Sequence, residues 1–173
     1  MTEASEVKFG EWLKAILVRD LKGLKRELDL YANERDMWKT APGISNSAGN
    51  LALHMVGNLR HFIGAQLGHS SYQRNRDAEF KGRDMPRAEI HKLVDMAIIG
   101  IEHTLPTLTD ADYAKTYPLK IAEMNLTTGE FLMHLAVHLT YHLGQVDYHR
   151  RMVTGQAGAP GVVSPLELSS ATA

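Results

Sequence analysis

Histidines at short, regular spacings are the residues of this chain best suited to chemistry. Four of the nine histidines, His134, His138, His142 and His149, lie in residues 131–152, the segment FLMHLAVHLTYHLGQVDYHRRM. Residues three, four and seven positions apart share one face of an α-helix, so these side chains form one stripe if the segment is helical. Imidazole is a common ligand of divalent metal ions, and the stripe therefore indicates a metal site.

Helix geometry limits which of these histidines can share an ion. Two histidines at positions i and i+4 can bind one metal ion from a single helix. His134 and His142 lie roughly 12 Å apart along a helix axis, at 1.5 Å per residue, which is too far to share an ion. The pair is therefore either His134 with His138 or His138 with His142. Catalytic zinc sites use three protein ligands plus water, so a further ligand must come from another helix.

Length, charge and composition exclude several classes of protein. The chain has 173 residues, enough for one domain with a sizeable core. Its formal net charge of −1 gives no electrostatic reason to expect nucleic acid or an anionic membrane as a partner. The absence of cysteine excludes disulfides, thiolate metal sites and cysteine nucleophiles. No apolar run is long enough to span a membrane and no signal peptide opens the chain, so we expect a cytoplasmic protein.

Apolar residues recurring every three or four positions predict four long helices. The first covers about residues 6–31, and the second begins at an N-cap among residues 45–47 and ends near Leu67. The third starts at Pro86 and ends near Leu105, because proline suits a first helical turn. Thr127 and Glu130 fit a capping box that opens the fourth helix, which Gly155 ends. Four amphipathic helices predict an all-α fold, a four-helix bundle.

Two segments lie outside these helices. Residues 69–85 form a long polar connection between helices two and three, which is either a functional covering element or a solvated crossover. Residues 156–173 are small and contain proline and glycine, so we expect a flexible C-terminal tail. The metal-binding domain is then expected to comprise residues 1–155.

Three stretches of the chain resemble a known superfamily. HLAVHLTYHLGQVDYHRRM is similar to the last-helix signature of the DinB/YfiT-like superfamily of metal-binding four-helix bundles. NSAGNLALHMVGNLRHFIG, residues 46–64, and RNRDAEF, residues 74–80, resemble one of its subfamilies of unknown function. That superfamily takes one metal ligand from helix two and two from helix four. The resemblance therefore implies a site made by His54, His138 and His142.

The same resemblance leaves the remaining histidines of these two helices without a ligand role. His61, which lies seven residues after His54, does not match a ligand position, and neither does His134. Ligand imidazoles need hydrogen-bond partners that orient them. Gln145 lies on the histidine stripe and is one candidate partner, while Asn50 and Asn58, each four residues from His54, are others. We expect the ion to be divalent, zinc or nickel.

The implied chemistry is the transfer of a low-molecular-weight thiol to an electrophile, because members of the resembling superfamily act on such thiols. A protein without cysteine is compatible with this reaction, since the sulfur comes from a small-molecule substrate. Hydrolysis is the alternative reaction. Zinc proteases place a glutamate after their first histidine ligand, whereas here Leu139 follows His138, so thiol transfer is ranked above hydrolysis.

Two non-enzymatic alternatives stay open from the sequence. One is a dimeric, stress-associated bundle that binds metal without turnover, and the other is a scaffold that binds no metal. We expect a homodimer, partly because the resembling bundles often pair. The other reason is that the C-terminal segment contains the apolar residues Val162, Val163, Leu166 and Leu168.

Overall fold

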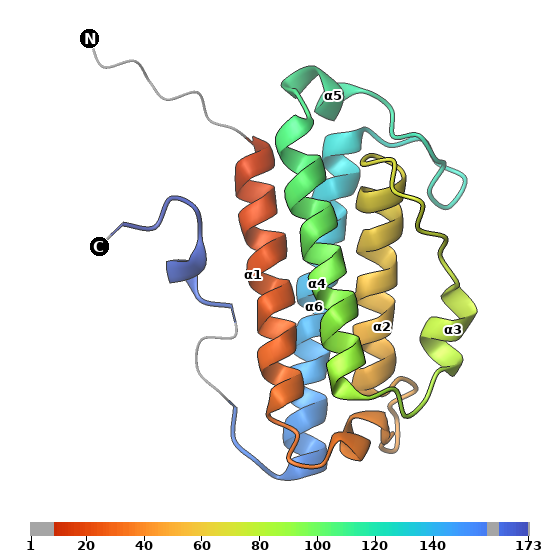
Figure 1. The fold of residues 1–173 in the computed structure, drawn as a ribbon, viewed down its shortest axis with the longest axis vertical. Coiled ribbons are helices and arrows are strands. Elements are labelled where there is room, and N and C mark those ends of the chain that lie inside the picture. Colours follow the sequence, from red (N-terminus) through yellow and green to blue (C-terminus); the bar gives the residue numbers. More distant parts are fainter. Residues whose placement is uncertain (1–8, 159–162, 173) are drawn as a thin grey trace.

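The fold is built on four long helices. The computed structural model describes residues 9–158 and 163–172. The long helices are α1 (Phe9–Asp29), α2 (Ala48–Leu59), α4 (Arg87–Thr104) and α6 (Thr128–Thr154). They lie side by side with roughly parallel axes (Figure 1). The described residues form no β-strand, only isolated bridges between Thr116 and Thr127 and between Ile121 and Met124, so the predicted all-α class is confirmed.

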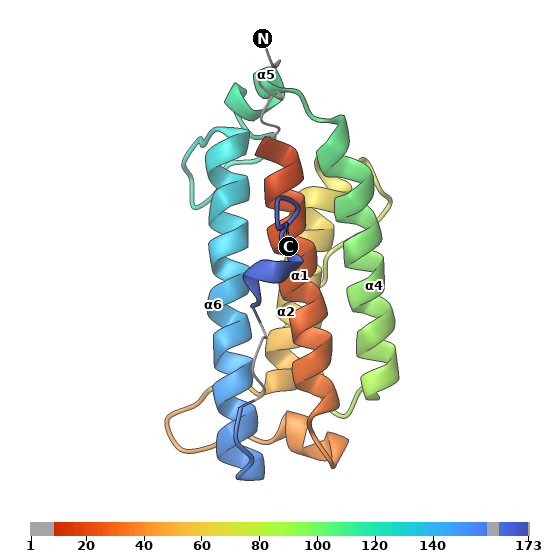
Figure 2. The same cartoon turned by 90° about the vertical axis from the view of Figure 1, so that its left-hand side faces the viewer.

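The long helices enclose a single apolar core. Helices α1 and α2 each pack against both α4 and α6, so the core lies between all four (Figure 2). The predicted stripe of α1 faces this core, where Leu17, Leu21, Leu24 and Leu28 have no exposed surface. Burying a leucine side chain stabilises the folded state by about 1.5–3 kcal/mol, so this stripe holds α1 in place.

The helix ends agree with the local sequence signals. The Ser47 side chain accepts a hydrogen bond from the Asn50 N–H at the start of α2. Thr127 accepts one from the Glu130 N–H at the start of α6, although the described contacts include no return bond from the Glu130 side chain. Gly155 ends α6 with φ 69°, a left-handed conformation that glycine adopts without strain. The predicted beginning of the first helix at Glu6 lies outside the described residues.

Short helical segments connect and extend the long helices. They are η1 (Glu34–Trp38), η2 (Arg60–Ala65), α3 (Arg76–Lys81), η3 (Leu105–Thr107), α5 (Asp110–Ala114) and η4 (Pro165–Glu167). Segment η2 is a π-helix that continues α2 without a break, with hydrogen bonds such as Gln66 N–H to the His61 carbonyl. Turns of π-helix occur often at functional sites. The predicted second helix is therefore one continuous helix, which is α-helical over α2 and π-helical over η2.

The connection between α2 and α4 covers the outside of α2. The sequence did not predict a helix there, yet the connection contains α3, which lies outside α2 in Figure 1. Glu79 of α3 is buried, with 5% of its surface exposed. A solvated crossover would leave a glutamate in water, so the segment is a covering element.

The C-terminal segment contacts α1. Glu167 of η4 accepts hydrogen bonds from Arg26, with Nη2 to Oε1 at 3.0 Å. Val163 and Leu166 are exposed, whereas Val162 lies outside the described residues. The division into a domain of residues 1–155 and a flexible tail stays a prediction. Among the described residues, none of the helices has the length and apolar character needed to cross a membrane.

Candidate metal centre

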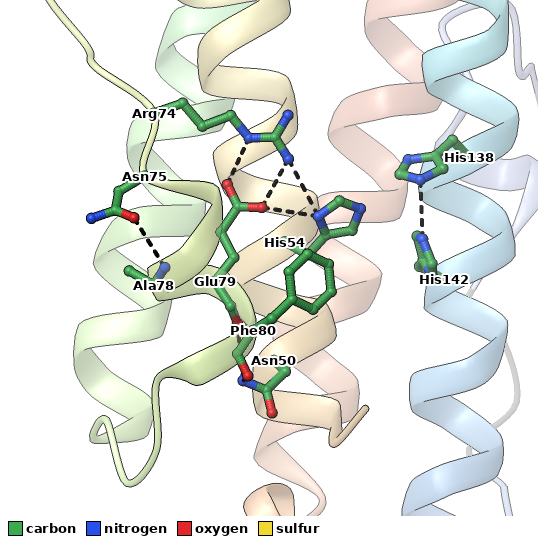
Figure 3. Close-up of polar contacts among 9 residues, drawn as sticks. All are labelled: Asn50, His54, Arg74, Asn75, Ala78, Glu79, Phe80, His138 and His142. Carbon is green, nitrogen blue, oxygen red and sulfur yellow. Dashed lines mark hydrogen bonds and ion pairs between the residues drawn. The ribbon is translucent and has the colours of Figure 1, made fainter. Parts of the chain in front are cut away.

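Three histidines from two helices meet between α2 and α6. His54 points from α2 toward His138 and His142 of α6 (Figure 3). Each can offer one ring nitrogen such that the three atoms lie within 4.8 Å of one another. The Nε2 atoms of His138 and His142 are 3.0 Å apart, and the His54 ring centroid is 5.2 Å from both other rings. The structure thus brings together the three residues that the sequence resemblance implied, and together they could hold a metal ion.

The donor set fits a divalent metal ion. Metal–nitrogen bonds of 2.0–2.1 Å in a tetrahedron place two ligand nitrogens about 3.3 Å apart. The 3.0 Å separation of the His138 and His142 nitrogens is close to this value, and the three atoms lie within 4.8 Å of each other. Small rotations of the three side chains would bring all three nitrogens within bonding distance of one ion. The other ring nitrogens of His54 and His142 are hydrogen-bonded to Glu79 and Gln145, so their Nε2 atoms are the ones available to an ion.

Burial keeps the two clustered histidines of α6 uncharged. His54 is buried, and His138 and His142 are half-buried, so the centre has a protein wall and a side open to solvent. Burial lowers the pKa of His138 to about 4, with further lowering by the neighbouring positive charges of His142 and His54. Burial also lowers the pKa of His142, although its hydrogen bond to Gln145 opposes this. Neutral imidazoles can bind a cation without first releasing a proton.

A buried carboxylate orients His54. Glu79 Oε2 lies 2.9 Å from His54 Nδ1, and because an ionised carboxylate can only accept, Nδ1–H donates. Arg74 binds the same carboxylate through both oxygens, with Nε to Oε1 at 2.7 Å and Nη2 to Oε2 at 2.8 Å. Burial raises the pKa of Glu79, but the hydrogen bonds from Arg74 and His54 outweigh it and the pKa is lowered. Glu79 therefore stays ionised and leaves the Nε2 lone pair of His54 facing the centre.

Asn50 holds α3 in the position that this contact requires. Its Nδ2 donates to the carbonyls of Glu79, Phe80 and Gly82, at 2.9, 3.1 and 3.0 Å. The Phe80 ring in turn packs on the His54 ring, with centroids 4.9 Å apart. At Gly57, one turn after His54, an added Cβ would overlap the Glu79 carboxylate. The Asn50 amide and the absence of a side chain at Gly57, both on α2, thus allow α3 to bring Glu79 against His54.

The sequence suggested three hydrogen-bond partners that would orient the clustered histidines, and one of these predictions is correct and two are wrong. Gln145 Oε1 accepts a hydrogen bond from His142 Nδ1 at 2.7 Å, as predicted. Asn50 acts through α3 instead of touching His54, because its amide is used by the α3 carbonyls. Asn58 is also a wrong prediction, since its buried Oδ1 has no hydrogen-bond partner among the described residues.

The other histidines of α2–η2 and α6 lie outside the three-residue group. His134 is exposed and stacks between Phe131 and His138, with ring centroids 6.1 and 6.0 Å away. His61 lies in the π-helical segment, where burial lowers its pKa. In the described part of the chain, the alternative pair His134–His138 acquires no third ligand and forms no such group.

His149 has a structural role. The Tyr31 hydroxyl lies 2.7 Å from His149 Nδ1, and the Lys39 carbonyl lies 2.8 Å from His149 Nε2. A carbonyl only accepts, so Nε2–H donates to Lys39 and Nδ1 accepts from Tyr31. Both ring nitrogens are therefore occupied, and the ring joins the end of α6 to the segment that follows α1.

Sequence reasoning missed Glu79 and Arg74. The only signal was their place in RNRDAEF, a stretch in which four of seven residues are charged. Nothing in the local sequence distinguishes Glu79 from Asp77, which is exposed and pairs with Lys81 in the same helix. The contact with His54 depends on how α3 folds back on α2.

Comparison with known proteins gives a family and no activity. No curated protein matches the chain. One family model matches residues 10–158, which include all three clustered histidines and all of the long helices except Phe9. On this evidence the chain belongs to the family described as protein of unknown function (DUF1572).

Proposed function

We propose that this protein is a metal-dependent enzyme of the DinB/YfiT-like superfamily that transfers a low-molecular-weight thiol to an electrophile. In this proposal the fold is a four-helix bundle, and a zinc or nickel ion is held by His54, His138 and His142. The observation that carries the proposal is the convergence of these three ring nitrogens within 4.8 Å from two helices. The contacts of His54 with Glu79 and of His142 with Gln145 add support, because metal ligands generally have such partners.

The residues of the chain define what the site offers to a substrate. When bound, a divalent ion supplies a Lewis acid that lowers the pKa of a thiol. The buried His54 and the half-buried Phe80 form one wall, while the half-buried His138 and His142 leave an open side through which a small molecule can enter. The chain contains no cysteine, so the reacting sulfur belongs to the substrate.

Hydrolysis is a second candidate, which two observations make weaker. A hydrolase needs a general base free to take a proton from water. Glu79 contacts a proposed ligand, but its two oxygens are bonded to Arg74 and His54 and its pKa is lowered. Leu139 also stands where zinc proteases have their glutamate. A metal-binding protein without turnover is the remaining alternative.

The test is turnover by the metal-loaded protein on a panel of thiols paired with electrophiles. We expect loss of free thiol and formation of a thioether that require the ion and disappear in His142→Ala. A parallel panel of esters and amides separates the hydrolase, which would release acid without consuming thiol. Stoichiometric metal with no turnover on either panel would support the non-catalytic alternative.

We also propose a cytoplasmic homodimer, with an apolar face of α1 and α6 as the contact. Trp12, Met133, Val137 and Tyr141 surround an apolar cavity of about 590 Å³ between these helices. Val137 is 70% exposed and Tyr141 62% exposed. Contiguous exposed apolar patches of this kind mark association sites. Light scattering should report a dimer for the native protein and a monomer for Val137→Glu, and a monomeric native protein at high micromolar concentration would contradict the proposal.

A further inference from the structure

A second cavity lies one helical turn from the metal centre. It has a volume of about 250 Å³ and is bounded by α6 and by the loop that precedes α2. Leu51 lines it, three residues before His54, and Gln145 lines it, three residues after His142. Helices α2 and α6 run in opposite directions (Figure 1), so both residues are displaced toward the same end of the molecule. Three residues rise about 4.5 Å along a helix axis, so these two lining residues lie just under one turn from the clustered histidines of their own helices.

The polar groups of this cavity are largely unused by the protein. Gln145 Oε1 accepts from His142, which leaves the two N–H groups of its Nε2 available. In the described part of the chain, the side chains of Ser45 and Asn46 make no hydrogen bond. His149 contributes only its ring, because Tyr31 and Lys39 occupy both nitrogens. The cavity thus offers hydrogen bonds to a carbonyl oxygen from the side that faces the metal centre.

The remaining walls are uncharged. Leu51 and Met152 provide apolar surface, and the lining includes no aspartate, glutamate, lysine or arginine. Gln145, Tyr148 and Met152 are exposed, so the cavity is open to solvent, and an ionised group placed here would meet no opposite charge on its walls. The cavity therefore favours a neutral polar group with a short apolar part.

We propose that this cavity binds the neutral amide portion of a small thiol substrate, with the Gln145 Nε2 group donating to the amide carbonyl. The position of the sulfur at the histidine cluster rests on the proposed function, whereas the amide subsite does not. N-acetylcysteamine is a suitable probe, because two methylene groups separate its sulfur from its amide. That separation is close to the axial offset of about 4.5 Å between Gln145 or Leu51 and the proposed ligand of the same helix.

The first experiment compares three thiols on cobalt-loaded protein, using the thiolate-to-cobalt charge-transfer band to measure dissociation constants. N-acetylcysteamine should bind about tenfold more tightly than propanethiol, the gain expected from one added hydrogen bond, and more tightly than the anionic 3-mercaptopropionate. Met152→Trp, which fills the cavity, should remove this preference, whereas Met96→Trp at an exposed site on α4 should keep it. Equal binding of all three thiols, or a preference for the anionic one, would overturn the subsite.

The second experiment removes both metal and thiol. N-ethylacetamide, which lacks the sulfur, is titrated into metal-free protein while NMR follows the side-chain amide signal of Gln145, assigned by its loss in Gln145→Ala. A saturable shift of this signal at millimolar N-ethylacetamide, absent in Met152→Trp, supports the subsite. If this shift is seen but no thiol binds the cobalt-loaded protein, the subsite stands and only the thiol-transfer proposal fails. No shift of the Gln145 signal contradicts the subsite, whatever the thiols do.

Discussion

His54 Nδ1 and Glu79 Oε2 lie 2.9 Å apart, although 25 residues separate them in the chain. Arg74 binds both oxygens of the same carboxylate and keeps it ionised, so the imidazole tautomer is set by a buried, charged neighbour. A carboxylate that accepts from a ligand histidine fixes the ring orientation and raises its basicity. This relationship makes α3 part of the site, and it leads to the first prediction.

Glu79→Gln should weaken metal binding while leaving the fold intact. Glutamine keeps the shape of the side chain but removes the negative charge that orients His54 and pairs with Arg74. Loss of such a partner commonly lowers metal affinity by about 10-fold to 100-fold. Competition with a chromophoric chelator measures the change. Glu102→Gln, on the exposed face of α4, is the control, and equal affinity of both variants with the native protein would exclude the orienting role.

Gly57→Ala should disturb the same contact from the other helix. The added Cβ would overlap the Glu79 carboxylate, so that side chain must shift and its bonds to His54 and Arg74 are disturbed, at a cost of about 1–3 kcal/mol. Gly144→Ala on α6 is the matched control, because no atom lies within 4 Å of its added Cβ. Replacing an unhindered helical glycine by alanine stabilises by about 0.5–1 kcal/mol. The midpoint of urea unfolding should therefore fall for Gly57→Ala and rise for Gly144→Ala. A stabilised Gly57→Ala would show that the Glu79 side chain accommodates the methyl group.

Single histidine variants should separate ligands from bystanders. His54→Ala, His138→Ala and His142→Ala each remove a proposed ligand, and each should lose most of the metal in elemental analysis. His134→Ala, His61→Ala and His149→Ala should retain it, since these side chains lie outside the group. If His142→Ala keeps the ion and His134→Ala loses it, the helix pair is His134 with His138 instead.

The metal-free protein should lose stability as the pH falls from 7 toward 5. Folding lowers the pKa of His149 by burial, and that of His138 to about 4. A histidine whose folded pKa lies below its unfolded value, near 6.5, binds more protons when unfolded. Its stabilising contribution is therefore complete above about pH 6.5 and is lost as the pH falls toward the folded pKa.

Urea unfolding in the presence of a chelator at several pH values measures this slope. His149→Gln keeps a donor for the Lys39 carbonyl but cannot titrate, so its stability should change less between pH 7 and 5. A stability that rises on acidification would show that these histidines are not held neutral in the folded protein.

Arg150→Met should be strongly destabilising because it leaves a buried charge unpaired. Arg150 Nε lies 2.6 Å from Glu27 Oε2, and both side chains are fully buried. Removing one partner of such a pair costs about 3–5 kcal/mol, while replacing both by apolar residues is often neutral. Urea unfolding should show recovery in Glu27→Leu/Arg150→Met. Lys81→Met, which breaks an exposed pair with Asp77, is the control and should cost less than about 0.5 kcal/mol.

Much of this molecule follows from the sequence through short-range rules. The apolar stripes of α1 and α6, the cap at Thr127 and the end at Gly155 depend on residues at most a few positions apart, and the structure has them where they were expected. The His138–His142 pair is local in the same way, because a spacing of four residues is enough to place two side chains on one helix face.

The tertiary structure alone decided which side chains meet across the core. Whether Glu79 leaves water and whether a cavity remains beside Gln145 both depend on how separate segments pack. The sequence around α3 is charged on several sides, so its periodicity does not identify the side that is buried. Contacts such as His54–Glu79 arise only when Asn50 and Gly57 let α3 lie against α2, and no local spacing records that arrangement.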